Sequence, residues 1–402
     1  MQNSSKSKGQ SGETTTLGEP RLVEFIRETI RRDGPVPFRW FMEQALYHPE
    51  HGYYSSGRAV IGRGGDYFTN VSVGPLFGRL MAAQFTEMWT LLGKPDELVV
   101  VEQGAHDGQL ADDVLRAVQQ RAPEFFDALT YRIVEPLPVL EQRQRAILAG
   151  FNDKVEWRRT VADLEPLTGV HFSNELLDAL PVHLVRWSGS EWSERHVVAN
   201  ADAFEFVDLP VTNSELQKHL DMITRPLPAG YETEVNLAAL QWVDEISRKL
   251  AHGFVLIVDY GFARDELYAS HRTAGTLQCY AKHQVVPSPL ASIGDIDITA
   301  HVDWTSIAER AESAGLALTG FANQHHFITG LLASKGGAEF VNGTDPKTKR
   351  ALQTLLHPEF LGMTFQFLAL SKGVEHGSRL AGFRFGRDPR VLQNGARADR
   401  SS

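Results

Sequence analysis

The stretch that decides the fold is VVVEQGAHDGQLADDVL, which runs from Val99 to Leu115. It begins as an apolar run typical of a buried strand and continues as an amphipathic helix, with Gly104 and Gly108 between the two parts. Glycine permits a sharp turn and lets the backbone approach a ligand closely. The free N–H groups at the start of a helix attract polar ligands. This order of elements predicts a loop that binds a nucleotide-like cofactor.

Strands and helices alternate on both sides of this stretch. The predicted order is strand 97–103, helix 109–122, strand 129–135, helix 136–148, strand 154–159 and strand 169–175, and later helix 232–251 and strand 253–261. Alternation at this spacing is characteristic of an α/β fold with a parallel, doubly wound sheet. We expect the sequence to form such a sheet around the glycine loop.

The remaining segments predict additions to this core. Short strands at 182–189, 191–199 and 203–209 indicate an inserted antiparallel meander, and residues 265–300 predict mostly loop. The expected parts are a disordered tail (1–19), a helical and loop region that covers the site (20–94), a core domain (95–386) with insertions at about 182–230 and 262–303, and a loose tail (387–402).

The composition limits the classes of function. The chain has 402 residues, of which 42% are hydrophobic and 22% charged, and its net charge is −10. A negative charge disfavours nucleic-acid binding, and no run approaches the ~20 apolar residues of a membrane span. A single cysteine and an N-terminal stretch without an apolar core or arginine lead us to expect a cytoplasmic protein. The oligomeric state stays open, with a homodimer among the options.

Acidic residues at the predicted loop indicate which cofactor it binds. Glu102 and Asp107 would repel a pyrophosphate, but they suit a cationic group such as an amino-acid ammonium. Glu135 ends the next strand, where a carboxylate can accept hydrogen bonds from both hydroxyls of a ribose. Asp163, after the third strand, is a candidate partner of an adenine amino group. Ammonium and ribose without phosphate describe S-adenosylmethionine. The alternative is a tight turn with Glu135 as a helix cap.

The segment SNELLDALPVH follows the fourth strand and contains three candidate catalytic residues. Asn174, Glu175 and Asp178 are polar residues in an otherwise apolar run. An acid here can orient a guanidinium or act as a general base for a hydroxyl or amine. The alternative is a helix N-terminus, with Asn174 as its cap and the two acids favouring the dipole.

Two further segments contain candidate site residues. The loop GGDYFTN contains Gly65, Asp66 and Thr69 and can close over a cofactor to exclude water. The strand 253–261 ends with Asp259 and Tyr260, and residues at such strand ends tend to face a site. The histidines lack the spacing of a metal site, so no metal is expected.

Together these motifs resemble the MidA family of S-adenosylmethionine-dependent methyltransferases, which includes a mitochondrial complex I assembly factor that methylates an arginine. The matching stretches are FMEQALYHPEHGYYSS, GGDYFTNVSVGPLFG, VVEQGAHDGQL, SNELLDALPVH, LIVDYGFARDE, GTLQCYAKH and DITAHVDW. The resemblance implies a class I, Rossmann-like methyltransferase fold, with seven strands of which the last, 364–372, is antiparallel. It also implies that Gly65, Asp66 and Thr69 lie near the cofactor and that Glu175 lies near the substrate.

The chain departs from the family pattern at two places. The usual Glu-Leu-Gly-Pro-Gly-Arg-Gly loop has His106 at the central glycine and Asp107 at the arginine. The usual Ser-Pro-Glu after the GGDYFT loop is Asn70-Val71-Ser72. The sequence therefore predicts an S-adenosylmethionine-dependent methyltransferase whose acceptor is a protein side chain, arginine among them, or a small molecule. One alternative is a non-catalytic cofactor-binding or assembly protein. The other is an NAD-dependent oxidoreductase, which Asp107 disfavours because a carboxylate in this loop would repel a pyrophosphate.

Overall fold

The main sheet has the strand order of a class I methyltransferase. The computed structural model describes residues 17–57, 70–200, 203–281, 284–340, 345–375 and 380–394. The sheet contains, in spatial order, β15 (Ala317–Asn323), β16 (Phe365–Lys372), β10 (Leu250–Phe262), β5 (Leu167–Asn174), β2 (Leu98–Gln103), β3 (Leu129–Val134) and β4 (Val155–Arg158). Strand β16 runs antiparallel to both its neighbours, and the other main strands run parallel to one another. The predicted fold class and the antiparallel strand are confirmed.

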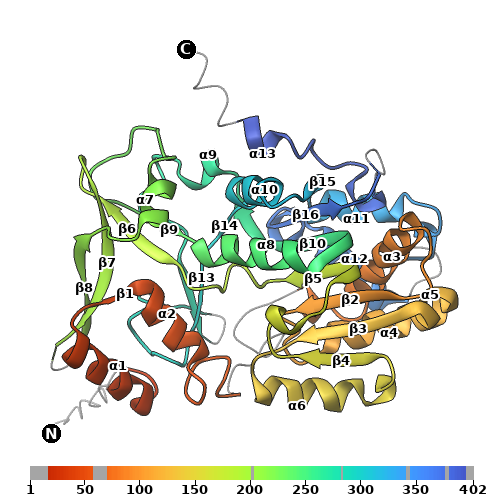
Figure 1. Ribbon diagram of the computed structural model, residues 1–402, viewed down its shortest axis with the longest axis horizontal. Coiled ribbons are helices and arrows are strands. Elements are labelled where there is room, and N and C mark those ends of the chain that lie inside the picture. Colours follow the sequence, from red (N-terminus) through yellow and green to blue (C-terminus); the bar gives the residue numbers. More distant parts are fainter. Residues whose placement is uncertain are drawn as a thin grey trace, which may run out of the picture.

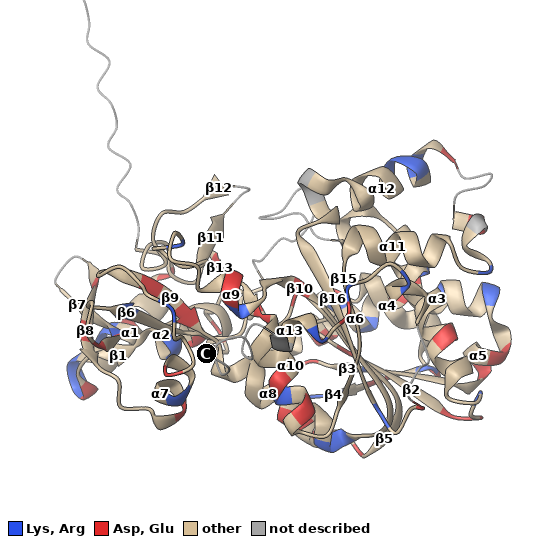
Figure 2. Cartoon of the chain, turned by 90° about the horizontal axis from the view of Figure 1, so that it is seen from above, with Lys and Arg blue, Asp and Glu red and all other residues tan. Residues whose placement is uncertain are grey.

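Helices cover both faces of this sheet, as Figure 2 shows for α11 and α12 on one side and α8 and α10 on the other. The first face packs against α3 (Leu76–Leu91), α4 (Gln109–Arg121), α5 (Pro123–Ala128), α11 (Gln324–Leu332) and α12 (Pro346–Leu356). The second packs against α8 (Leu237–Lys249) and α10 (Trp304–Ser313), and α6 (Pro138–Ile147) lies beside α4. Val100 and Val101 belong to opposite cores, because successive strand side chains alternate between faces.

The N-terminal helices and both insertions form a second lobe, seen at the left of Figure 1. Its elements are α1 (Pro20–Asp33), β1 (Val36–Pro37), α2 (Phe38–Tyr47), β6 (His183–Trp187), β7 (Trp192–Ala199), β8 (Phe204–Pro210), α7 (Ser214–Leu220) and β9 (Tyr231–Val235). The short β1 pairs with β7, so Val36 lies opposite Val197. Phe41, Val197 and Ile298 share one hydrophobic core although they come from three separate parts of the chain. The first two N-terminal helices and residues of both expected insertions therefore pack as one unit.

The structure differs from the expected secondary structure at several places. The expected helix 232–251 begins only at Leu237, because Tyr231–Val235 pairs with β6 as a strand and the Asn236 side chain caps α8. The expected loop 265–300 contains the strands β11 (Gln278–Ala281), β12 (Gln284–Val285) and β13 (Asp297–Thr299). These strands lack the length and alternation by which a sequence indicates a strand.

Two further differences concern the ends of the core. Helix α3, which falls in the N-terminal region expected to cover the site, packs in the core against β5, where the Phe85 and Phe172 ring centres are 5.4 Å apart. The expected loose tail contains a short helix, α13 (Val391–Asn394), whose Leu392 is buried. None of the helices described is long and apolar enough to span a bilayer.

Candidate functional site

The glycine loop joins β2 to α4 in the expected way. Gly104 and Gly108 have φ angles of 82° and 88°, and Gly108 is the N-cap of α4. Both positions lie in the left-handed region that favours glycine. His106 also adopts a positive φ, 46°, at the place where the family pattern has its central glycine. A non-glycine residue in this conformation is under backbone strain of about 1 kcal/mol, so the loop accommodates a histidine at this position at a small cost.

Asp107 and Glu102 occupy different environments at this loop. The Asp107 carboxylate accepts a hydrogen bond from the Gln109 N–H (3.1 Å) and lies 3.7 Å from the His106 ring. Burial raises the pKa of Asp107, but the His106 ring and nearby N–H groups outweigh it, so the pKa is lowered overall. Glu102 is buried and accepts a hydrogen bond from the Tyr131 hydroxyl (2.7 Å). Burial raises the pKa of Glu102 to about 7.

Glu135 is fixed at the end of β3 and tied to the glycine loop. One carboxylate oxygen accepts from the Leu137 N–H (3.0 Å), and the other accepts from the Gln144 amide (2.8 Å). The same Gln144 nitrogen donates to the His106 carbonyl (2.8 Å), and Trp157 donates to the Gln144 oxygen (3.0 Å). No sequence pattern singles out Gln144, because a glutamine on a helix between strands is usually exposed. Burial raises the pKa of Glu135 to about 7.

The structure does not bring Asp163 to this loop. Its carboxylate accepts hydrogen bonds from the backbone N–H and the hydroxyl of Thr160, as a cap of its own turn. The neighbouring carbonyls bind Lys249, which directly precedes the first residue of β10. Asp163 therefore lies toward the opposite, amino edge of the sheet. Gly65, Asp66 and Thr69 lie outside the described residues.

Asp259 organises the second half of the site. One oxygen of its fully buried carboxylate accepts from the N–H groups of Leu176, Leu177 and Asp178 at 3.2, 2.8 and 3.3 Å. The other oxygen accepts from the Tyr260 N–H at 2.8 Å. Asp259 thus holds the backbone of the segment that the sequence singled out. Asn174 is not a helix cap, because no helix directly follows β5. The side chain that accepts from the backbone N–H groups of this segment is Asp259, which belongs to β10.

Glu175 and its neighbours carry polar atoms that lack partners. Glu175 has a φ of 54° and accepts a hydrogen bond from the Asn174 amide (2.9 Å) through one oxygen. Among the described residues, the second Glu175 oxygen, Asn174 Oδ1 and Asp178 Oδ1 are buried without a hydrogen-bond partner. Burial, with the nearby Asp259, raises the pKa of Glu175 to about 8. Burial and the same acidic neighbours raise the pKa of Asp178 well above its usual value.

Tyrosines from the second lobe close this side of the site. Tyr47 and Tyr54 stack with ring centres 5.4 Å apart, and Tyr47 donates to the Ala179 carbonyl (3.1 Å). Tyr54 donates to Asp297 (2.7 Å). Burial raises the pKa of Tyr47, and the charge of Asp297 raises it further. Asp297 is the first residue of DITAHVDW, one of the stretches that carry the family resemblance. The acidic segment after β5 therefore lies against an aromatic wall that the N-terminal lobe supplies.

The polar atoms left unpaired at the carboxyl edge of the sheet fit a bound cofactor and acceptor. Buried atoms without partners in the described chain include His106 Nε2 at the glycine loop and Ser173, Asn174 and Glu175 at the end of β5. Native proteins seldom leave such groups unpaired, so a cluster of them points to a ligand. In the described parts of the chain, no group of three or more His, Cys, Asp or Glu side chains is arranged to hold a metal.

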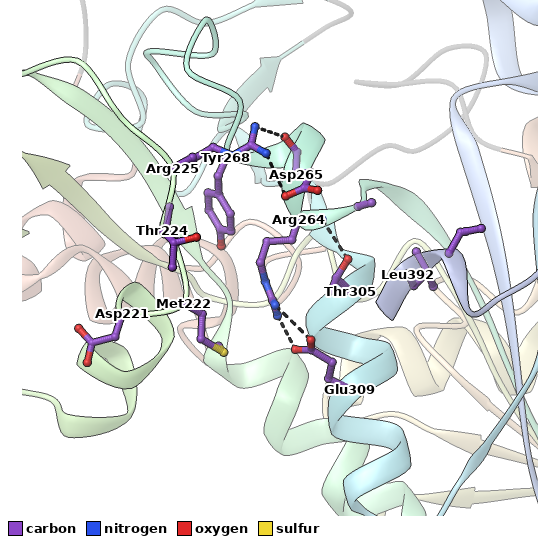
Figure 3. A pocket seen from close by; sticks show the side chains of 13 residues that line it. Asp221, Met222, Thr224, Arg225, Arg264, Asp265, Tyr268, Thr305, Glu309 and Leu392 are labelled. Carbon is purple, nitrogen blue, oxygen red and sulfur yellow. Dashed lines mark hydrogen bonds and ion pairs between the residues drawn. The ribbon is translucent and has the colours of Figure 1, made fainter. Parts of the chain in front are cut away.

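A separate cavity of about 630 Å³ lies between α7, α9 (Arg264–Leu267), α10 and α13 (Figure 3). Its arginines are already paired: Arg225 with Asp265 (2.9 Å) and Arg264 with Glu309 (2.6 Å). None of the sequence-predicted site residues lines it. This cavity is therefore not the candidate active site.

Comparisons with known proteins agree with this geometry. Residues 80–322 match a family described as "Putative S-adenosyl-L-methionine-dependent methyltransferase". The mitochondrial protein arginine methyltransferase NDUFAF7 homolog of Drosophila melanogaster is 26% identical, over 92% of this chain and 89% of that protein. The human protein arginine methyltransferase NDUFAF7 is 24% identical, over 92% and 86%.

A solved structure extends the likeness to the whole fold. A candidate methyl transferase from Burkholderia thailandensis, bound to S-adenosyl-homocysteine, is 32% identical and superimposes with a TM-score of 0.83, over 92% of this chain and 96% of that one. These matches confirm the resemblance that the motifs indicated. The chain belongs to this family of S-adenosyl-L-methionine-dependent methyltransferases, and S-adenosyl-L-methionine is its cofactor.

Proposed function

We propose that this enzyme methylates a guanidinium nitrogen of an arginine side chain in a protein. The observation that carries the proposal is the pair of buried, unpartnered carboxyl oxygens on Glu175 and Asp178. Two relatives over most of the chain are named protein arginine methyltransferases, which supports the same acceptor class here. The departure at Asn70-Val71-Ser72 does not remove these acids.

A guanidinium supplies the hydrogen-bond donors and the positive charge that the carboxyl groups of Glu175 and Asp178 lack as partners. It has five N–H donors and a permanent positive charge, so it can pair with a carboxylate through two parallel hydrogen bonds. Burial disfavours the charged form of a carboxyl, and burial together with the nearby Asp259 raises the pKa of Glu175 to about 8. Binding of a cation would lower that pKa and return Glu175 to its charged form.

The proposed mechanism needs few groups. When bound, the cofactor supplies an electrophilic methyl group on a sulfonium. Glu175 binds and orients the guanidinium, and its carboxylate accepts the proton that the nitrogen loses. Asp259 holds the backbone of residues 176–178 and so keeps Glu175 and Asp178 in place. The paired rings of Tyr47 and Tyr54 exclude water from this side.

Three peptides of identical sequence, with arginine, lysine or glutamine at one central position, test this proposal. Incubated with S-adenosylmethionine and analysed by mass spectrometry, the arginine peptide should gain methyl groups at the central side chain, and the other two should not. Glu175→Gln should remove the transfer while S-adenosyl-homocysteine still binds. Methylation of the lysine peptide, or transfer that survives Glu175→Gln unchanged, would overturn the proposal.

A further inference from the structure

Asn70 is a buried amide for which the fold offers no partner. Its side chain is fully buried, and neither the oxygen nor the nitrogen of the amide has a hydrogen-bond partner in the described parts of the chain. It directly precedes the turn Val71–Val73 that leads into α3. A buried amide left without partners destabilises a protein, so such a group calls for an explanation.

Two other fully buried amides of the same protein have partners on both polar atoms, and a third, Gln324, has one on its nitrogen (3.0 Å). Gln84, on α3, donates to Glu87 (2.7 Å) and accepts from the Gly382 N–H (3.2 Å). Gln144 also uses both its oxygen and its nitrogen. Both glutamines are as fully buried as Asn70. The lack of partners at Asn70 is therefore not a general property of buried amides in this fold.

Asn70 lies beside the proposed acceptor site. Its backbone N–H is one of the groups that favour the charged form of Glu175, which places the two residues side by side. The unpartnered atoms of Asn174 and Glu175 belong to the same region. A ligand bound there would meet the carboxylate of Glu175 and the neutral amide of Asn70 together.

We propose that Asn70 is an acceptor-binding residue whose Oδ1 accepts an N–H of the guanidinium that Glu175 leaves free. This inference rests on the proposed function. A guanidinium has more N–H donors than one carboxylate can use, and a neutral acceptor takes up another without adding charge to an acidic site. The unpaired Asn70 amide is then a pre-organised part of the substrate site. The free energy that its burial costs in the ligand-free protein is recovered when the acceptor binds.

Asn70→Leu tests the inference, because leucine has a similar volume and removes both polar atoms. In the ligand-free protein the melting temperature should stay unchanged or rise, since an unpaired buried amide is lost. Calorimetry should show unchanged S-adenosyl-homocysteine binding. The Kd for the arginine peptide, measured with S-adenosyl-homocysteine bound, should rise at least about tenfold, and KM should rise more than kcat falls. Asn70→Ser, which keeps a hydroxyl oxygen, should recover part of the affinity.

Gln84→Leu is the matched control, because it removes a buried amide that already has partners. It should lower the melting temperature and leave the Kd for the peptide unchanged. A fall in the melting temperature of Asn70→Leu with an unchanged peptide Kd would make Asn70 structural and overturn the inference. If the wild-type enzyme neither binds nor methylates the arginine peptide, the proposed function itself fails. If the wild type does both and Asn70→Leu matches it, the inference alone fails.

Discussion

Replacing Glu175 by glutamine should stabilise the ligand-free enzyme while removing its activity. The folded protein holds Glu175 with a pKa of about 8, whereas an unfolded chain leaves it near 4.5. A raised pKa means that the folded state binds a proton which the unfolded state releases. The acid therefore has no effect on stability below about pH 4, and it increasingly destabilises the protein as pH rises from about 4 to about 8.

The size of the effect follows from the same two pKa values. At about 1.4 kcal/mol for each tenfold change, full ionisation of Glu175 in the folded state would cost about 5 kcal/mol. Relaxation of the site and the entry of water reduce this value, and single stabilising substitutions commonly gain about 0.5–2 kcal/mol. We expect Glu175→Gln to raise the free energy of unfolding by about 2 kcal/mol at pH 8 and by almost nothing at pH 4.

Urea unfolding of wild type and variant at the two pH values measures this difference. Glu205→Gln is the control, because Glu205 is an exposed acid in the second lobe and should have no pH-dependent effect. The reasoning is refuted if Glu175→Gln destabilises the protein at pH 8, or if its effect is the same at both pH values.

Three other substitutions test the supports of the site. Gly104→Val places a branched side chain at a φ of 82°, so the free energy of unfolding should fall by about 1–2 kcal/mol. The affinity for S-adenosyl-homocysteine, measured by calorimetry, should fall at least about tenfold. An unchanged affinity would contradict the placement of the cofactor loop. Gln144→Leu releases Glu135 from the loop and should weaken the same affinity about tenfold, with little change in KM for the peptide. Asp259→Ala leaves buried N–H groups without an acceptor and should lower the free energy of unfolding by about 3–5 kcal/mol in urea, with Asp259→Asn losing less.

Local patterns in the sequence predicted the parts of the fold that depend on local chemistry. The apolar run 99–101 and the glycines at 104 and 108 were enough to place a strand, a turn and a helix, because conformation at each of these positions depends on the residue itself. The place of Glu135 near the glycine loop was also predicted, because the carboxyl ends of neighbouring parallel strands meet at one edge of the sheet. The stretch 364–372 indicated the last strand by its own pattern, and only its antiparallel direction came from the family resemblance.

Long-range contacts could not be predicted from the sequence. Asp259 was expected to face the site, but it holds the backbone N–H groups of a segment more than eighty positions away, as the Leu176 and Leu177 contacts show. The Gln144 bridge and the burial of Asn70 depend in the same way on which helix packs beside which strand. The cofactor role of Gly65, Asp66 and Thr69 stays a prediction, as do a cytoplasmic location and a homodimer.

The most direct test of whether Glu175 binds a guanidinium is to measure the protons released when the acceptor binds. Titration of the arginine peptide into the enzyme with S-adenosyl-homocysteine, by calorimetry at pH 7 in two buffers of different ionisation enthalpy, counts the protons exchanged. Because Glu175 is protonated in the free site and charged beside a cation, about one proton per site should be released, and Glu175→Gln should remove this release. Binding without proton release, or release that persists in Glu175→Gln, would contradict an arginine acceptor held by this carboxylate.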